Sequence, residues 1–145
     1  MLINLNKEHI DALVELESKC FTQDAWSRDM LEDCFKGQNY YCIGYGQTAL
    51  QGYLIACFNP WEIELLSIGV LQEFREQKIA YKLMQSLIDF AKQNNKEKIF
   101  LEVRKSNLPA INLYTKCNFK PIYERKNYYQ GTEDAIIMEL CVNEF

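Results

Sequence analysis

Two polar side chains on apolar elements and one polar turn are the parts of this sequence that could do chemistry. Glu102 lies within the apolar segment 98–104, and Tyr114 lies on the helical stripe that follows it. The turn 72–78 joins a nearly continuous apolar run to a segment of helical period. It therefore brings the unpaired N–H groups of a helix N-terminus next to the end of a buried strand. Such an arrangement can hold a phosphate group.

Glu102 has two interpretations. On the strand KIFLEVR it shares a side with Phe100 and Arg104, so we expect its carboxylate to be partly buried. Burial raises the pKa of a carboxyl group unless Arg104 or a hydrogen bond offsets the effect. The residue is then either a general base or one half of a structural ion pair. The strand pattern alone does not choose between the two.

Tyr114 is ambiguous in a similar way. It shares a helix face with Ala110 and Ile111, and either Ser106 or Asn107 would cap that helix. A tyrosine on an apolar stripe usually packs in the core, which is the interpretation that this residue favours on its own. A role as a proton donor is the alternative.

Two pairs of aromatic residues occur beside polar segments. Phe21 and Trp26 bracket a polar loop, and Tyr128 and Tyr129 lie in KNYYQGTED, which we expect to be a loop between two closing strands. Phe21 and Trp26 either pack in the core or form a pocket wall. The tyrosine-rich loop is either an exposed hairpin connection or a surface that faces a substrate, because loops often carry recognition.

The elements that position these residues follow from periodicity and capping. Apolar runs and alternation predict strands over 2–5, 40–45, 51–58, 62–70, 98–104, 120–125 and 134–142. Helical spacing predicts four helices: from the cap Asn6 to Lys19, from the cap Ser27 to about Phe35, from Ile79 to a stop at 94–96, and from Ser106 or Asn107 to 117.

Composition limits the class of protein. The chain has 145 residues, a mean hydropathy of -0.28 and no apolar run near the length of a membrane span, so we expect one domain without a membrane partner. Its start lacks a basic region followed by an apolar run, which predicts a cytoplasmic protein. A net charge of -4 and a pI near 5.1 disfavour nucleic acid and suit a basic substrate.

The cysteines and the histidine form no pattern of metal ligands, so we expect no metal site. Six cysteines are scattered at 20, 34, 42, 57, 117 and 141 without C-x-x-C spacing, and His9 is the one histidine. Free cysteine prefers the interior, so reduced and mostly buried thiols are expected. The alternative is one reactive thiol, and no pattern selects it.

The order of elements, with a phosphate-holding turn before a long helix, resembles the GNAT family of acetyl-CoA-dependent N-acetyltransferases. More narrowly, the segments FTQDAWS, ELLSIGV, LEVRKSNLPAINLYTKCNF, RKNYY and EDAIIMEL resemble its ribosomal-protein alanine N-acetyltransferases. The resemblance covers nearly the whole chain. It implies one α/β (α+β) domain over 1–145, with a mixed, mostly antiparallel central sheet that is splayed in the middle and flanked by about four helices.

The resemblance also implies roles for individual residues, with acetyl-CoA as cosubstrate and no metal. Glu102 matches the general base and Tyr114 the general acid, and the Val70 N–H would polarise the thioester carbonyl. The implied cofactor-binding residues are Ile68, Gly69, Val70, Arg75, Glu76, Gln77, Lys78, Ile79, Ala80 and Asn107. The implied substrate-binding residues are Phe21, Trp26, Tyr128 and Tyr129.

Two positions depart from the family pattern. Lys78 replaces a glycine of the signature Arg/Gln-x-x-Gly-x-Gly/Ala, which is matched here by 75–80, and Asn118 replaces another glycine. A Cβ at Lys78 hinders close approach of a pyrophosphate to the backbone, whereas its charge favours phosphate. Asparagine tolerates the left-handed conformation, so the second change is milder. We expect acetyl-CoA to bind.

The function implied is transfer of an acetyl group to the N-terminal alanine of a basic small-subunit ribosomal protein, by a protein for which a monomer is favoured. One alternative keeps the chemistry and changes the acceptor to a small-molecule amine, such as a polyamine or an aminoglycoside. A second alternative is a non-catalytic interaction module that lost cofactor binding through Lys78. The presence of both Glu102 and Tyr114 disfavours that module.

Overall fold

The computed structural model describes residues 1–21, 25–129 and 133–144, and a mixed seven-stranded sheet organises them. The strands are β1 (Leu2–Asn4), β2 (Tyr40–Gly46), β3 (Leu50–Phe58), β4 (Glu62–Val70), β5 (Lys98–Arg104), β6 (Lys120–Tyr129) and β7 (Glu133–Cys141). Their order is β1-β2-β3-β4-β5-β7-β6, and β4–β5 is the parallel pair. The predicted fold class is confirmed.

Four α-helices accompany the sheet: α1 (Ile10–Cys20), α2 (Arg28–Asp33), α3 (Ile79–Gln93) and α4 (Leu108–Lys116). Ser27 caps α2 as predicted, with Oγ accepting the Met30 N–H at 3.2 Å. Asn6 Oδ1 accepts the Glu8 N–H at 2.8 Å, but it caps a 3-10 turn over Lys7–His9 that precedes α1. Among the described helices, none has the length and apolar character needed to cross a bilayer.

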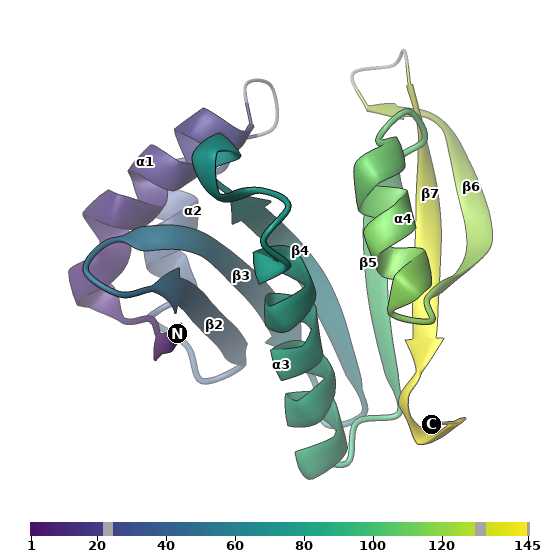
Figure 1. Ribbon diagram of the computed structural model, residues 1–145. Helices are drawn as coiled ribbons and strands as arrows, with labels where there is room; N and C mark the ends of the chain where they lie inside the picture. The colour runs from purple at the N-terminus through teal and green to yellow at the C-terminus, as the bar shows by residue number, and fades with distance from the viewer. Residues whose placement is uncertain (22–24, 130–132, 145) are drawn as a thin grey trace.

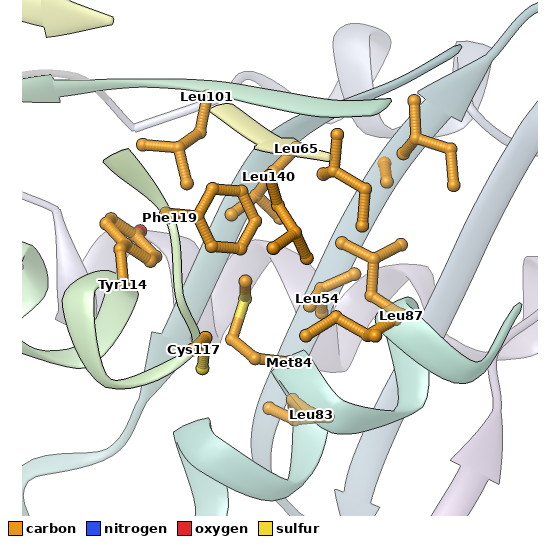
Figure 2. Packing of buried hydrophobic residues seen from close by; sticks show 14 of the residues in the cluster. Leu54, Leu65, Leu83, Met84, Leu87, Leu101, Tyr114, Cys117, Phe119 and Leu140 are labelled. Atoms are coloured by element: carbon orange, nitrogen blue, oxygen red, sulfur yellow. The ribbon is translucent and has the colours of Figure 1, made fainter. Parts of the chain in front are cut away.

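The helices cover the sheet from its two sides (Figure 1). Residues of α1 and α2 pack with Tyr53 and Ile55 of β3 in one core cluster. Residues of α3 and α4 pack with Leu54 and Ala56, which point to the opposite face, in a larger cluster. Figure 2 shows the larger cluster, in which Met84 and Leu87 of α3 lie near Phe119 and Leu140.

The sheet is splayed at its centre. β4 and β5 pair only at Glu62–Lys98, Ile63–Ile99 and Glu64–Phe100. From there the two strands diverge toward the end of β4 from which the chain leads to α3, as Figure 1 shows. β5 pairs along its whole length with β7 instead. The gap between β4 and β5 therefore opens toward the phosphate turn.

A bulge shapes the part of β4 that borders this gap. Ile55 pairs with Ser67 and Ala56 with Leu65, which leaves Leu66 as the extra residue. Leu66 and Ser67 consequently face the same side, toward α1, whereas Leu65 packs on the α3 side. The bulge changes the phase of the strand just before it reaches Val70.

The prediction that Tyr128 and Tyr129 lie in a loop was wrong. β6 continues to Tyr129, and Tyr129 pairs with Glu133 at the start of β7. Tyrosine favours strands, and the pairing tolerates a bulge in which Asn127 takes a φ of 51° and donates its N–H to Asp134 Oδ1 at 2.8 Å. Residues 130–132 of the expected loop lie outside the described residues.

Candidate active site

The open end of the β4–β5 gap presents backbone groups of Val70. The Leu71 N–H donates to Gln51 O on β3 at 2.9 Å, so the preceding N–H, that of Val70, points to the opposite edge of β4. That edge borders the gap, because β4 no longer pairs with β5 there. A carbonyl oxygen held in the gap could accept this N–H.

The phosphate turn is attached directly to the end of β4. Arg75 Nε donates to the Val70 carbonyl oxygen at 3.0 Å. Glu76 and Lys78 take left-handed conformations, with φ of 68° and 63°, and α3 begins at Ile79 without a side-chain cap. The first N–H groups of α3 are thus left available, as an anion site requires.

The remaining signature residues lie as a phosphate site needs them. Arg75, Glu76, Gln77 and Lys78 are exposed, whereas Ile79 is buried in the core and holds the start of α3 in place. Ala80 is half-buried beside it. The backbone of the turn is therefore accessible while the helix that follows is fixed.

Glu102 points to the face of the sheet opposite α3 and α4. Its neighbours Leu101 and Val103 are buried in the larger core, so Glu102 emerges on the other face with a side chain that is 26% exposed. Its ion-pair partner is Arg125 on β6, with 3.5 Å between Oε1 and Nη1. The expected partner Arg104 contacts Glu133 Oε2 instead, at 2.8 Å, because the β5–β7 register brings that pair together.

Glu64 is a neighbouring carboxylate that the sequence analysis did not single out. Loss of part of its hydration, and then the negative charge of Glu102, raise the pKa of Glu64, while Arg125 acts in the opposite direction. The sequence did contain a signal for Glu64, because a carboxylate between Ile63 and Leu65 of the apolar β4 is unusual. Its proximity to Glu102 required knowledge of the β4–β5 register.

The two tyrosines at the end of β6 approach different partners. The negative charge of Glu102, together with a hydrogen bond to its carboxylate, raises the pKa of Tyr128. Tyr128 remains half exposed, and its ring lies 5.1 Å from Arg125 Cζ. Tyr129 meets Tyr128 edge-on at 5.2 Å and lies 4.2 Å from Arg104 Cζ. Tyr128 is thus part of the Glu102 environment.

Tyr114 lies on the other face of the sheet from Glu102. It is buried in the larger core with its ring centroid 6.1 Å from that of Phe119, and Figure 2 shows the two rings side by side. Burial, and then the charge of Tyr129, raise the pKa of Tyr114. The raised pKa keeps this hydroxyl protonated near neutral pH, so it is able to act as a proton donor.

The other predicted site residues have structural contacts. Asn107 is exposed and caps α4, with Oδ1 accepting the Ala110 N–H at 3.3 Å. Phe21 and Trp26 are partly buried against the core cluster of α1 and α2, which agrees with packing. Residues 22–24 of the loop between them lie outside the described residues. Contact of Phe21 or Trp26 with a substrate stays a prediction.

The structure therefore brings Glu102, Tyr128 and Arg125 together on one face of the splayed sheet and places Tyr114 on the other. The backbone N–H of Val70 and the start of α3 lie at the open end of the gap. No group of His, Cys, Asp and Glu suited to a metal ion occurs in the described part of the chain. These groups can transfer protons and stabilise negative charge on a carbonyl oxygen.

Comparison with known proteins agrees with this class of site. Residues 10–119 match the acetyltransferase (GNAT) family, and the chain belongs to that family. It is 32% identical to an inferred ribosomal protein bS18-alanine N-acetyltransferase of Bacillus subtilis (strain 168), over 97% of this chain and 95% of the relative.

Two solved structures show the same fold. The crystal structure of the ribosomal-protein-S18-alanine N-acetyltransferase from Escherichia coli superposes with a TM-score of 0.91 and 27% identity, over 98% of this chain and 93% of the other. Arabidopsis thaliana NAA60 in complex with acetyl-CoA gives a TM-score of 0.87 at 16% identity, over 99% of this chain and 98% of the other.

Proposed function

We propose that this protein, as a single domain over 1–145, transfers the acetyl group of acetyl-CoA to the N-terminal alanine amine of a ribosomal protein in the cytoplasm. One observation carries the proposal: the splayed β4–β5 gap has Glu102 on one face, Tyr114 on the other and the uncapped start of α3 at its open end. The names of the B. subtilis and E. coli relatives support the choice of acceptor.

The residues fit acetyl-CoA, which supplies an activated acetyl thioester. The exposed turn 75–78 and the uncapped N–H groups of α3 suit a pyrophosphate, since they combine backbone donors with a positive helix end. The Val70 N–H would stabilise negative charge that develops on the thioester oxygen. Ile68, Gly69 and Asn107 would border the pantetheine arm of acetyl-CoA, which joins the pyrophosphate to the thioester.

Glu102 would accept the proton that the acceptor amine must lose. A protein α-amine has a pKa of about 7.7–8.0, so a fair fraction is neutral near pH 7 and Glu102 needs to accept only the proton that the amine releases as it attacks. A lysine amine, with a pKa of about 10.4, would be almost fully protonated. The site therefore suits an N-terminus better than a lysine side chain.

Tyr114 would donate a proton to the leaving thiolate. Its raised pKa keeps the hydroxyl protonated near neutral pH, as a donor must be. A thiol has a pKa of about 8.5, so the thiolate leaves readily and proton donation assists rather than decides the step. Alignment of amine and thioester would supply most of the acceleration, about 7–11 kcal/mol in favourable cases.

The acceptor side of the site is acidic and aromatic. Glu64 and Glu102 lie on the face where Tyr128 is half exposed, and carboxylates attract an ammonium group. Phe21, Trp26 and Tyr129 would complete the wall around the first residues of the acceptor. This environment also suits a small-molecule amine, so acceptor length is the property to test.

The experiment is intact-mass analysis of two peptides incubated with protein and acetyl-CoA. One peptide begins with free alanine and continues with basic residues, and the other has a blocked N-terminus and an internal lysine. We expect one acetyl group on the first peptide and none on the second. Acetylation of free polyamines, with neither peptide modified, would favour the small-molecule alternative.

A calorimetric titration with acetyl-CoA distinguishes a non-catalytic interaction module from the two acetyltransferase functions. A protein that binds acetyl-CoA and modifies no amine would keep the cofactor assignment and refute the acceptor assignment. A protein that shows no binding would be the non-catalytic module, and the whole proposal would fall.

A further inference from the structure

Glu17 of α1 is a fully buried carboxylate on which three donors converge. Oε2 accepts the Trp26 backbone N–H at 2.8 Å, and Oε1 accepts the Ser67 hydroxyl at 2.5 Å. The Tyr53 hydroxyl also donates to Oε1. Tyr53 is itself fully buried, and burial followed by the charge of Glu17 raises its pKa, which keeps it a donor. A buried carboxylate with this many donors is well satisfied.

Two of these donors support the part of β4 that leads to Val70. Ser67 is on the β4 bulge, and Tyr53 lies opposite Gly69 in the β3–β4 pairing. A Cβ at Gly69 would lie 2.8 Å from the Tyr53 ring and 3.0 Å from Cys20 Sγ, so the end of β4 rests directly on these side chains. The position of Tyr53 therefore sets the position of the strand that carries the Val70 N–H.

The third donor belongs to the segment between α1 and α2. Trp26 is partly buried against the core cluster of α1 and α2, and its N–H bond to Glu17 fixes the backbone just before Ser27, the cap of α2. Phe21, at the other end of this segment, closes α1 through its own N–H to Glu17 O at 2.9 Å. Glu17 thus contacts Phe21 through its backbone carbonyl and Trp26 through its carboxylate, and the contact with Trp26 is the one that depends on its side chain.

We propose that Glu17 is a positioning residue that fixes the acceptor wall at Trp26 relative to the Val70 end of β4. The inference rests on the proposed function, because those two parts serve the amine and the thioester respectively. It assigns the alignment of the two substrates to one side chain that touches neither of them. Catalysis by alignment is sensitive, since a misplacement of about 1 Å can cost 10²-fold in rate.

The carboxylate suits this role because both of its oxygens accept hydrogen bonds, which matches the three donors around it. A carboxylate accepts on both oxygens, whereas an amide of the same shape accepts on one and donates on the other. In Glu17→Gln, an N–H₂ group would face either the Trp26 N–H or the two hydroxyls. In the first orientation the bond to the Trp26 N–H is lost. In the second the two hydroxyls must change from donors to acceptors, and the negative charge that strengthens their bonds is gone. Either way the amide keeps the volume of the side chain and weakens the link between Trp26 and β4.

The test compares Glu17→Gln with the matched control Glu15→Gln, which removes an exposed carboxylate of the same helix that pairs with Lys19 at 2.9 Å. Both are assayed with the alanine-starting peptide at a temperature where circular dichroism shows them folded. For Glu17→Gln we expect a fall in kcat of about tenfold or more, a rise in peptide KM, and an acetyl-CoA Kd within about twofold of wild type. Glu15→Gln should match wild type in all three.

A second readout does not depend on activity. In a Trp61→Phe background Trp26 is the remaining tryptophan, and Trp61 is 63% exposed and away from the cluster. Acrylamide quenching of Trp26 fluorescence should increase in Glu17→Gln, and Tyr53→Phe, which leaves the Trp26 N–H bond in place, should change kcat without changing the quenching. The two variants thus distinguish the bond of Glu17 to Trp26 from its bond to Tyr53.

The outcomes decide between the possibilities. If the wild type acetylates no peptide, the proposed function fails, whereas unchanged kcat, KM and quenching in a folded Glu17→Gln would refute the positioning role alone. A Glu17→Gln variant that loses only thermal stability would show a purely structural residue and would also overturn the inference.

Discussion

Arg75 Nε donates a hydrogen bond to the carbonyl oxygen of Val70 at 3.0 Å, so the phosphate turn is attached to the last residue of β4. The turn and the strand would serve different parts of acetyl-CoA, the pyrophosphate and the thioester. Their attachment fixes the distance between the two binding points before any ligand arrives. Preorganisation of this kind reduces the entropy lost on binding.

Replacing Arg75 by alanine should weaken acetyl-CoA binding. The variant loses a charge-assisted hydrogen bond and a cation beside the turn, which together predict a Kd about tenfold higher, or about 1.4 kcal/mol. Isothermal titration measures it. Lys92→Gln, which removes the same charge near the C-terminal end of α3, is the control. An equal loss in both variants would mean that only net charge matters.

Replacing Lys78 by glycine should stabilise the protein. Lys78 has a φ of 63°, a conformation that costs a residue with a Cβ about 1–2 kcal/mol, partly offset by the greater chain entropy of glycine. We expect the free energy of unfolding to rise by about 0.5–1 kcal/mol in urea titrations. Lys78→Ala removes the charge and keeps the Cβ, so it should show no such gain. A gain in Lys78→Ala would assign the effect to charge instead.

Much of this architecture could be predicted from local sequence. The cap Ser27, the pair Ser106 and Asn107, and the change of period after Lys78 located the starts of α2, α4 and α3, because capping is a short-range interaction. Asn6 marked the 3-10 turn that leads into α1. The apolar run of β4 indicated a buried strand. It could not reveal the bulge at Leu66, since an apolar run without alternation carries no phase.

The missed parts of the site depend on contacts between distant segments. Arg125 on β6 pairs with Glu102 on β5 across the strand β7 that lies between them, which requires knowledge of the strand order. Arg104 pairs with Glu133 because of the β5–β7 register. Sequence spacing contains neither fact. Glu17 had a visible signal, since it follows Leu13 by four residues on the buried stripe of α1, but its partners come from three other segments.

Glu102→Gln and Tyr114→Phe should each lower kcat by ~10²–10⁴ if the two residues act as base and acid. Tyr114→Phe is the cleaner change, because it removes one hydroxyl group and keeps the packing of the ring against Phe119. Its thermal stability should stay close to that of the wild type. Steady-state rates with the alanine-starting peptide test both, and wild-type turnover in either variant removes that residue from the mechanism.

Glu64→Gln should change the pH dependence of stability. The pKa of Glu64 is raised in the folded state, so its protonated form favours folding at low pH, and that contribution is lost as pH rises through the folded pKa. Above that pH the charged carboxylate beside Glu102 disfavours the fold. We therefore expect Glu64→Gln to raise the Tm slightly at pH 7, by on the order of 1 °C because the group is solvent-screened, and to leave it unchanged near pH 4.

Differential scanning calorimetry at the two pH values measures the difference, with Glu139→Gln on the same face as the control. A shift of the same size at both pH values would show that the effect of Glu64 is packing and not charge.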